Sequence, residues 1–255
     1  REYDKSLEYY AKVELNRDGV EDSSRVLYFH RKSEIFFSQG KILEGIKHLL
    51  QAKKYAEKTK ETRLIGDVNH GLGENFGRIK EYKKAISYYT IAKEAFEKSG
   101  SYDRQLSTKL YMANAYSQQK DYLVAEKLYT EIIRKADSSD NFNTKYRAVM
   151  GLYGMFYNNN EMHKVAATAT KYSLTDYYSR IKDTGSLYSV KGVYAEVAAN
   201  YDSADWYYRK VIDIAYKSPF KTNTAICSYN FSEYLIKHKR YKEALPYMNS
   251  ALAIY

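Results

Sequence analysis

The 255-residue sequence contains a single cysteine, Cys227, and lacks long apolar segments. One cysteine excludes an internal disulfide and a cysteine-rich zinc site. The longest apolar run, residues 148–157, is well short of the roughly 18 residues that a membrane-spanning helix needs, so we expect no membrane insertion by this segment. These features leave the compartment open, cytoplasmic or periplasmic.

Helix-breaking residues are also scarce, with 2 prolines and 12 glycines. Such a composition favours long helices joined by short connections. The net charge is +10, yet no run of five or six like charges occurs. Lys and Glu interleaved along solvated helix faces explain this balance. Nucleic-acid binding is the alternative for a basic chain with 30 tyrosines.

A four-residue pattern recurs through the chain, in which an aromatic or large residue is followed by two variable residues and a small one. The small residues are Ser6, Gly45, Ala85, Ala125, Val165, Ala204 and Ala244, spaced by 39 or 40 residues. A bulky residue, usually Tyr, follows most of these anchors by four positions and so lies on the same helix face. We expect the small residue to admit a neighbouring helix and the bulky one to fill the adjoining gap.

A second pattern precedes each anchor, as in residues 72–76 and 112–116, so each repeat is predicted to be a helix, a tight turn and a second helix. Turn and cap residues such as Thr59, residues 99–101, residues 138–141 and residues 183–185 separate these elements. The predicted organisation is one repeat domain over residues 1–255: a leading half repeat (1–20) and six repeats (21–60, 61–100, 101–140, 141–180, 181–219 and 220–255).

The segments Leu72–Ala85, LGENFGRIKEYKKA, and Met112–Ala125 resemble the tetratricopeptide repeat signature. The resemblance covers essentially the whole chain, although the repeat is about 40 residues long where the family's has 34. Longer repeats of this kind are similar to those of bacterial sensor and regulator proteins. The resemblance implies an all-α fold, a right-handed α-solenoid of antiparallel helix pairs, in which most of the repeated tyrosines pack between helices.

In the resembled fold the first helices line a concave groove that binds a peptide or protein partner. The repeat register assigns the following residues to that groove: His30, Glu34, Phe37, Asp67, His70, Glu74, Asn114, Arg147, Tyr157, Tyr229 and Glu233. Some members hold a C-terminal carboxylate with Lys and Asn at these positions. Only Asn114 fits that pattern here, so we do not expect this type of binding.

Two His-x-x-x-Glu pairs, His30 with Glu34 and His70 with Glu74, lie one repeat apart. A metal ion needs three or four ligands around it. The pairs could converge on one ion only if their helices pack closely, since neighbouring helix axes lie roughly 8–10 Å apart. We instead expect a hydrogen bond or ion pair within each pair or a contact with a ligand, and no metal or other cofactor.

No residue is expected to be catalytic. The register pairs no histidine with Cys227, and the sequence has no glycine-rich phosphate loop. Gly71, Gly73 and Gly77 fall inside a helical repeat, where they permit close packing. We therefore expect a binding scaffold rather than an enzyme.

Within that class, the sequence favours the sensing or regulatory segment of a larger bacterial signalling or transcription-regulating protein. An assembly adaptor without a signalling role is the alternative, and a nucleic-acid-binding repeat protein has less support. Solenoids need polar caps at their ends. The half repeat at the start and the apolar residues 251–255 lack them, so we expect either a longer protein or self-association through the open ends.

Overall fold

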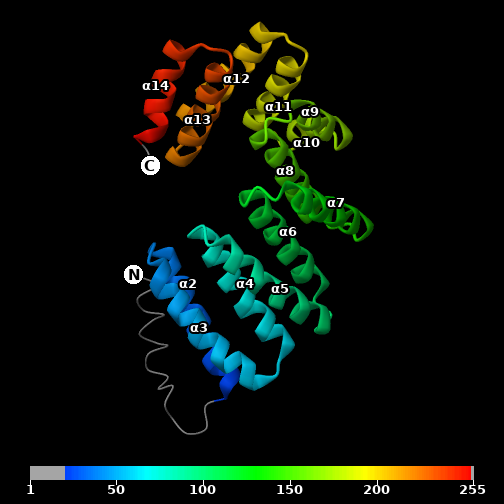
Figure 1. The fold of residues 1–255 in the computed structure, drawn as a ribbon, viewed down its shortest axis with the longest axis vertical. Helices are drawn as coiled ribbons and strands as arrows, with labels where there is room; N and C mark the ends of the chain where they lie inside the picture. The colour runs from blue at the N-terminus through cyan, green and yellow to red at the C-terminus, as the bar shows by residue number, and fades with distance from the viewer. Residues whose placement is uncertain (1–20, 254–255) are drawn as a thin grey trace. The chain divides into compact units, whose positions relative to one another are not determined.

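The computed structural model describes residues 21–253, and all of its regular elements are α-helices (Figure 1). In chain order they are α2 (Asp22–Ser38), α3 (Ile42–Thr59), α4 (Thr62–Arg78), α5 (Tyr82–Lys98), α6 (Tyr102–Gln118), α7 (Tyr122–Ser138), α8 (Phe142–Asn158), α9 (Met162–Lys171), α10 (Leu174–Arg180), α11 (Thr184–Val197), α12 (Tyr201–Lys217), α13 (Lys221–Lys237) and α14 (Tyr241–Leu252). The prediction of an all-α helical repeat is confirmed. The leading half repeat and the last two residues of the apolar end lie outside the described residues.

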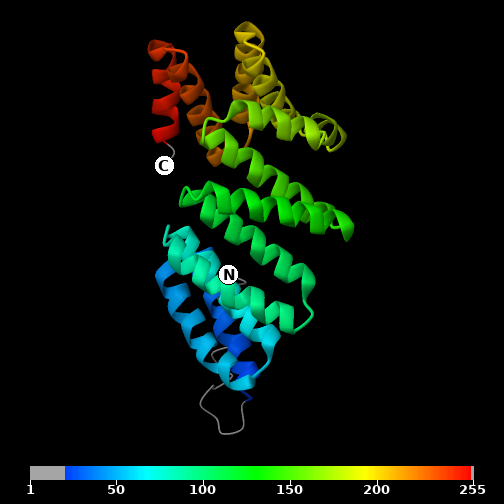
Figure 2. The ribbon, with the colours of Figure 1, turned by 45° about the vertical axis from the view of Figure 1, so that its right-hand side comes forward.

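The chain divides into two compact units inside α8, one ending at Leu152 and the other starting at Tyr153. In the first unit each helix from α2 to α7 packs on the next along the chain, and Figures 1 and 2 show them running back and forth side by side. The first helices α2, α4 and α6 also contact one another in sequence. This brings their side chains together on one side of the unit. None of the described helices is long and apolar enough to cross a membrane.

Most helices of the first unit end in one repeated turn; α3 differs, since the Glu61 amide donates to the Thr59 hydroxyl at 3.1 Å. A residue with left-handed backbone occurs every 20 positions, at Gly40, Lys60, Lys80, Gly100, Lys120 and Asp140. At the end of α4 the Lys80 amide donates to the Gly77 carbonyl at 3.0 Å, and the Glu81 amide donates to the Phe76 carbonyl at 2.9 Å. Such bonds satisfy carbonyls that the helix leaves free at its C-terminus. The left-handed residue every 20 positions keeps the register of successive helices constant.

Side-chain caps at helix starts are fewer than the sequence predicts. Asn141 accepts from the Thr144 amide at 3.1 Å, and Asp183 accepts from the Ser186 amide at 3.0 Å. Ser101 makes no such cap, because its hydroxyl pairs instead with Ser99 at 2.9 Å. The backbone bonds of the turn therefore end most helices.

The predicted anchors Gly45, Ala85, Ala125, Ala204 and Ala244 are all buried at the starts of second helices. A Cβ atom at Gly45 would lie 2.2 Å from the Phe37 ring, so the missing side chain makes room for that aromatic.

The tyrosines four positions after the anchors are accommodated in the same way. Tyr89 packs against Gly73, and Tyr208 packs against Gly192, with a built Cβ 2.5 and 2.6 Å from the ring. In both contacts a glycine on a first helix makes room for a tyrosine ring on the second helix of the same repeat. The packing prediction fails for Tyr201 and Tyr241, which are 49% and 62% exposed.

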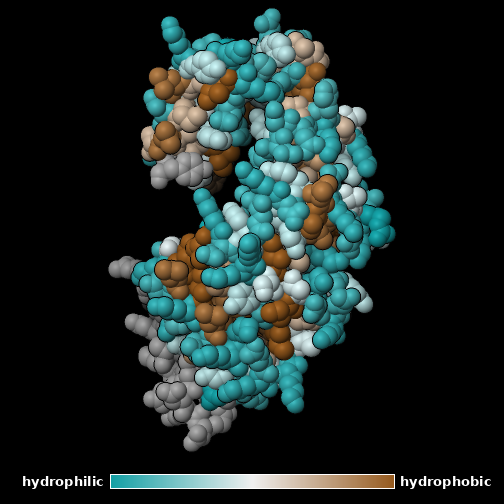
Figure 3. Space-filling model, viewed as in Figure 1, coloured by the Kyte–Doolittle hydropathy of each residue, from teal (hydrophilic) through white to brown (hydrophobic). Residues whose placement is uncertain are grey.

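The fourth repeat departs from the pattern. Its second helix is broken into α9 and α10 at Ser173, which has left-handed backbone. The break falls just after Ala169, where the usual bulky residue is missing, and Leu174 and Tyr178 from the short α10 are buried in its place. The visible face of the molecule is mostly hydrophilic, with separate hydrophobic patches over the helices (Figure 3).

Candidate functional site

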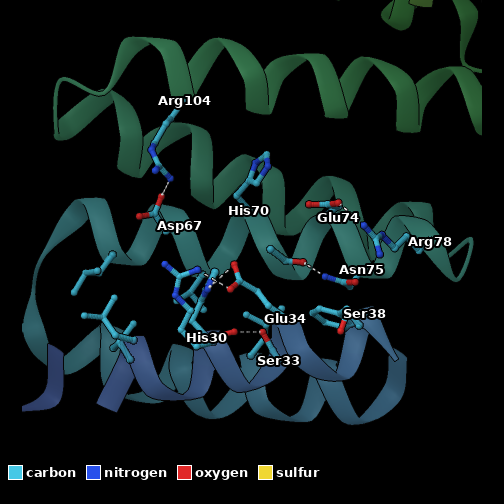
Figure 4. Close-up of a pocket in the computed structure, with 18 residues that line it drawn as sticks. His30, Ser33, Glu34, Ser38, Asp67, His70, Glu74, Asn75, Arg78 and Arg104 are labelled. Atoms are coloured by element: carbon cyan, nitrogen blue, oxygen red, sulfur yellow. Dashed lines mark hydrogen bonds and ion pairs between the residues drawn. The ribbon is translucent and has the colours of Figure 1, made fainter. Parts of the chain in front are cut away.

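The first helices of the first unit line an open groove of about 650 Å³. Its walls come from α2 and α4, and Arg104 reaches it from α6 (Figure 4). Six of the predicted groove residues line it: His30, Glu34, Phe37, Asp67, His70 and Glu74. We call this the unit-1 groove. Its floor is apolar, with Val26, Leu49 and Val68 among its lining residues.

The charged groups of the unit-1 groove are paired with one another. Arg31 donates to Glu34 at 2.8 Å, and Arg78 donates to Glu74 at 2.8 Å. Arg104 forms an ion pair with Asp67, which links α6 to α4. Three cations thus offset three carboxylates, and the groove has no net charge while its histidines are neutral.

Asp67 shows the balance of burial against charge. Burial raises the pKa of its carboxyl group, and the Arg104 guanidinium opposes that shift. Burial outweighs the guanidinium, so the net effect is a raised pKa. A ligand that displaced Arg104 would therefore need to supply a replacement donor.

The two His-x-x-x-Glu pairs behave differently. His30 Nδ1 lies 3.6 Å from a Glu34 carboxylate oxygen, too long for a direct hydrogen bond but within range of an ion pair. His70 Nδ1 instead lies 3.0 Å from the Thr108 hydroxyl, because Glu74 is taken by Arg78. His30 therefore lies near Glu34 without a hydrogen bond to it, and His70 contacts Thr108 instead of Glu74.

Both histidines favour the neutral form. Burial lowers the pKa of His30, and the neighbouring Glu34 and Asp67 carboxylates oppose the shift. Burial likewise lowers the pKa of His70, whose ring lies 5.0 Å from that of Tyr111. Within residues 21–253, no group of three or more His, Cys, Asp or Glu could hold a metal ion.

Asn114 and Arg147 do not belong to the lining of the unit-1 groove. The Tyr129 hydroxyl donates to Asn114 at 2.6 Å, so this amide supports a packed tyrosine. The Arg147 guanidinium lies over the Tyr111 ring, 5.6 Å from its centroid. The repeat register correctly placed these two residues on first helices. It could not predict that each side chain would be engaged by a neighbouring tyrosine.

A second groove, of about 540 Å³, lies within the second unit. We call it the unit-2 groove. It contains the remaining three predicted residues, Tyr157, Tyr229 and Glu233. The other lining residues are Asn158, Asn160, Met162, Glu196, Asn230, Tyr234, Ile236 and Lys237.

Glu196 is a groove residue that the sequence interpretation missed. Its side chain is 6% exposed, and it accepts from the Lys237 ammonium at 2.7 Å and from the Tyr208 hydroxyl at 3.0 Å. The signal in the sequence is a lone acidic residue in the otherwise apolar stretch Val193–Ala199. In the first unit, Arg31, Arg78 and Arg104 were missed because their partners lie on other turns or other helices.

The environment of Cys227 disfavours its thiolate form. Its side chain is partly buried, and burial raises the pKa of the thiol. Since the thiolate is the nucleophile, a raised pKa lowers its concentration near neutral pH.

The sequence matches no protein-family model and no curated protein. The structure, in contrast, is similar to solved helical-repeat structures. The apo form of RapI aligns with a TM-score of 0.80 at 11% identity, over 100% of this chain and 92% of that one. The chain has a tetratricopeptide-type repeat fold.

Two further structures share this fold. Aspartyl phosphate phosphatase F from Bacillus subtilis aligns with a TM-score of 0.74 at 13% identity, over 99% of this chain, which spans 63% of the phosphatase. NprR in complex with its cognate peptide NprX aligns with a TM-score of 0.63 at 16% identity, over 97% of this chain and 70% of NprR. The resemblance to long repeats of bacterial regulators is therefore confirmed at the level of the fold.

Proposed function

We propose that this chain is a peptide-binding repeat scaffold that serves as the sensing or regulatory segment of a bacterial signalling protein. The observation that carries the proposal is that both units have an open groove beside first helices, at positions assigned from the repeat register alone. A groove of several hundred Å³ with an apolar floor and a polar rim suits a short extended segment. NprR, which has the same fold, was solved with a peptide.

The proposal includes a role in binding rather than in catalysis. The perturbed groups of the unit-1 groove are already engaged: Asp67 with Arg104, and His70 with Thr108. His70 contacts a hydroxyl, that of Thr108, but this side chain is fully buried and donates to the Arg104 carbonyl at 2.8 Å, so it is engaged within the fold. The similarity to a phosphatase concerns the fold and transfers no activity.

The test is selection of peptides from a random hexapeptide library displayed on messenger RNA, with the purified chain immobilised. We expect enriched peptides that bind the free chain in fluorescence polarisation. Glu74→Lys should weaken peptides bound in the unit-1 groove at least tenfold, because it removes the partner of Arg78 and adds a cation to the rim. Glu94→Lys makes the same charge change on the exposed face of α5 and should leave binding unchanged.

Absence of enrichment over uncoated beads would contradict peptide binding. Equal losses from Glu74→Lys and Glu94→Lys would show that the selected peptides respond to net charge rather than to the groove. A gel shift with a random single-stranded oligonucleotide, read at two salt concentrations, would show whether nucleic acid competes for the same surface.

A further inference from the structure

We propose that the unit-2 groove is selective for a peptide carrying a cationic group, a lysine or arginine side chain or a free N-terminal ammonium. This inference rests on the proposed function and specifies the ligand that one of its two grooves accepts. It starts from the charges that line this groove.

The unit-2 groove has an uncompensated carboxylate. Glu196 and Lys237 pair with each other at 2.7 Å and cancel. Glu233, one turn before Lys237 on α13, is exposed and makes no hydrogen bond or ion pair with any residue in the described part of the chain. The residues that line this groove therefore include two carboxylates, Glu196 and Glu233, against one ammonium, Lys237, whereas the unit-1 groove is balanced.

The carboxylates act on the same place in the groove. Burial raises the pKa of the Tyr157 phenol, and the charges of Glu196 and Glu233 raise it further. Both carboxylates are therefore close enough to act on one phenol from α8. A cation beside that phenol would gain from both carboxylates at once.

Aromatic rings complete the surroundings. Tyr157, Tyr229 and Tyr234 all line the groove, and the Tyr229 side chain is 48% exposed. Ring faces attract ammonium and guanidinium groups, with each contact contributing roughly 0.5–1 kcal/mol at exposed sites. The side chains of Asn158, Asn160 and Asn230 make no hydrogen bond with other described residues, so their amide oxygens can accept from polar donors of the ligand.

An anionic ligand does not fit this arrangement. The only ammonium in the lining, Lys237, is held by the buried Glu196, and removing it would leave that carboxylate unpaired in a buried position. A ligand carboxylate would also meet Glu233. The groove therefore discriminates by charge in favour of cations.

The experiment uses the full chain and a positional-scanning hexapeptide library in which each position in turn is fixed as Lys, Arg, norleucine or Glu. Each set is made with free and with acetylated N-termini, which separates a side-chain cation from a terminal ammonium. Binding is read by fluorescence polarisation. For a side-chain cation, we expect at least one position at which peptides with Lys or Arg bind about tenfold more tightly than those with norleucine, and peptides with Glu bind least. For a terminal ammonium, we expect acetylation to weaken binding about tenfold.

The decisive variant is Glu233→Gln, which removes the charge and keeps the size of an exposed side chain. We expect it to reduce the preference for the cation about five- to tenfold and to make binding less dependent on salt. Tyr229→Leu should reduce the preference while Tyr229→Phe retains it, because Phe keeps the ring face. Asp213→Asn is the matched control, since it removes an exposed charge from α12 away from the groove.

The outcomes separate the two proposals. If no peptide binds, the proposed function fails. If peptides bind but show no preference for Lys, Arg or a free N-terminus, or if Glu233→Gln and Asp213→Asn have the same effect, the cation selectivity is refuted and peptide binding stands. Selection of Glu at the sensitive position would refute it as well.

Discussion

Both units pack successive helices along the chain, but the first does so with a more regular spacing of turns than the second. In the first unit, left-handed turns recur every 20 residues and the charges of the groove pair internally. In the second, α9 and α10 divide one helix, and Glu233 stays unpaired among the described residues. The left-handed residues of this unit are Asn160, which continues the 20-residue series, and then Ser173, Lys182, Ala199 and Lys239, which do not. In the regular unit, the charged side chains of the groove form ion pairs with one another. The irregular unit leaves groups available, in keeping with the tendency of local rules to fail where a protein binds something.

The largest expected effect tests whether the units are independent. Ala85 is fully buried, so Ala85→Arg forces a charge into a close helix contact and should cost more than about 3 kcal/mol. Hydrogen exchange should show lost protection in α4 and α5 while α11 to α14 stay protected. The control is Lys83→Arg, at an exposed position two residues away. An unchanged melting temperature for Ala85→Arg would mean that the repeat register is wrong.

The second prediction compares the ion pairs of the two grooves. Glu196→Ala removes a buried carboxylate from Lys237 and Tyr208 and should lower the free energy of unfolding by about 2–3 kcal/mol in urea. Asp67→Ala breaks a pair whose Arg104 side chain is half exposed and should cost at most about 1 kcal/mol. Equal losses would remove the energetic distinction between the two grooves.

The third prediction concerns pH. The pKa values of His30 and His70 are lowered in the folded chain, so the unfolded chain binds more protons below pH 6.5. Stability should therefore be complete above that pH and fall as pH drops towards 5, with a decrease of a few degrees in Tm. Asp67 acts in the opposite direction nearer pH 4, because its pKa is raised. The double variant His30→Gln, His70→Gln should have a flatter profile between pH 7 and 5. A profile identical to the parent's would exclude these histidines as the source.

The smallest expected effect tests the repeated turn. Lys120 has φ of 65°, a conformation that costs a residue with a side chain roughly 1–2 kcal/mol. Lys120→Gly should stabilise the chain by about 0.5–1 kcal/mol after the entropy cost of glycine. Lys127→Gly, in the interior of α7, should destabilise it by about 1 kcal/mol. If both variants were destabilised alike, the turn would not be a source of strain.

The sequence predicts the fold well because periodicity reports packing directly. Ala85 and Ala125 are buried where the 40-residue spacing places them, and nine of the eleven groove residues line one of the two grooves. Periodicity does not report pairing. The choice of Thr108 over Glu74 by His70 depends on a helix 38 residues away, and the burial of Glu196 depends on Lys237, 41 residues away. Likewise, the helix break at Ser173 accompanies the burial of Leu174 by α10. The repeat spacing alone does not predict this burial.

The left-handed turns also bear on the basic character of the chain. Five of the nine non-glycine residues with left-handed backbone in residues 21–253 are lysines: Lys60, Lys80, Lys120, Lys182 and Lys239. Each follows the C-terminus of a helix, where the aligned peptide dipoles leave partial negative charge. With Asp140 counted against the five lysines, these nine positions carry a net charge of +4 just beyond helix C-termini. Part of the chain's net charge of +10 therefore lies where the helix dipoles favour cations.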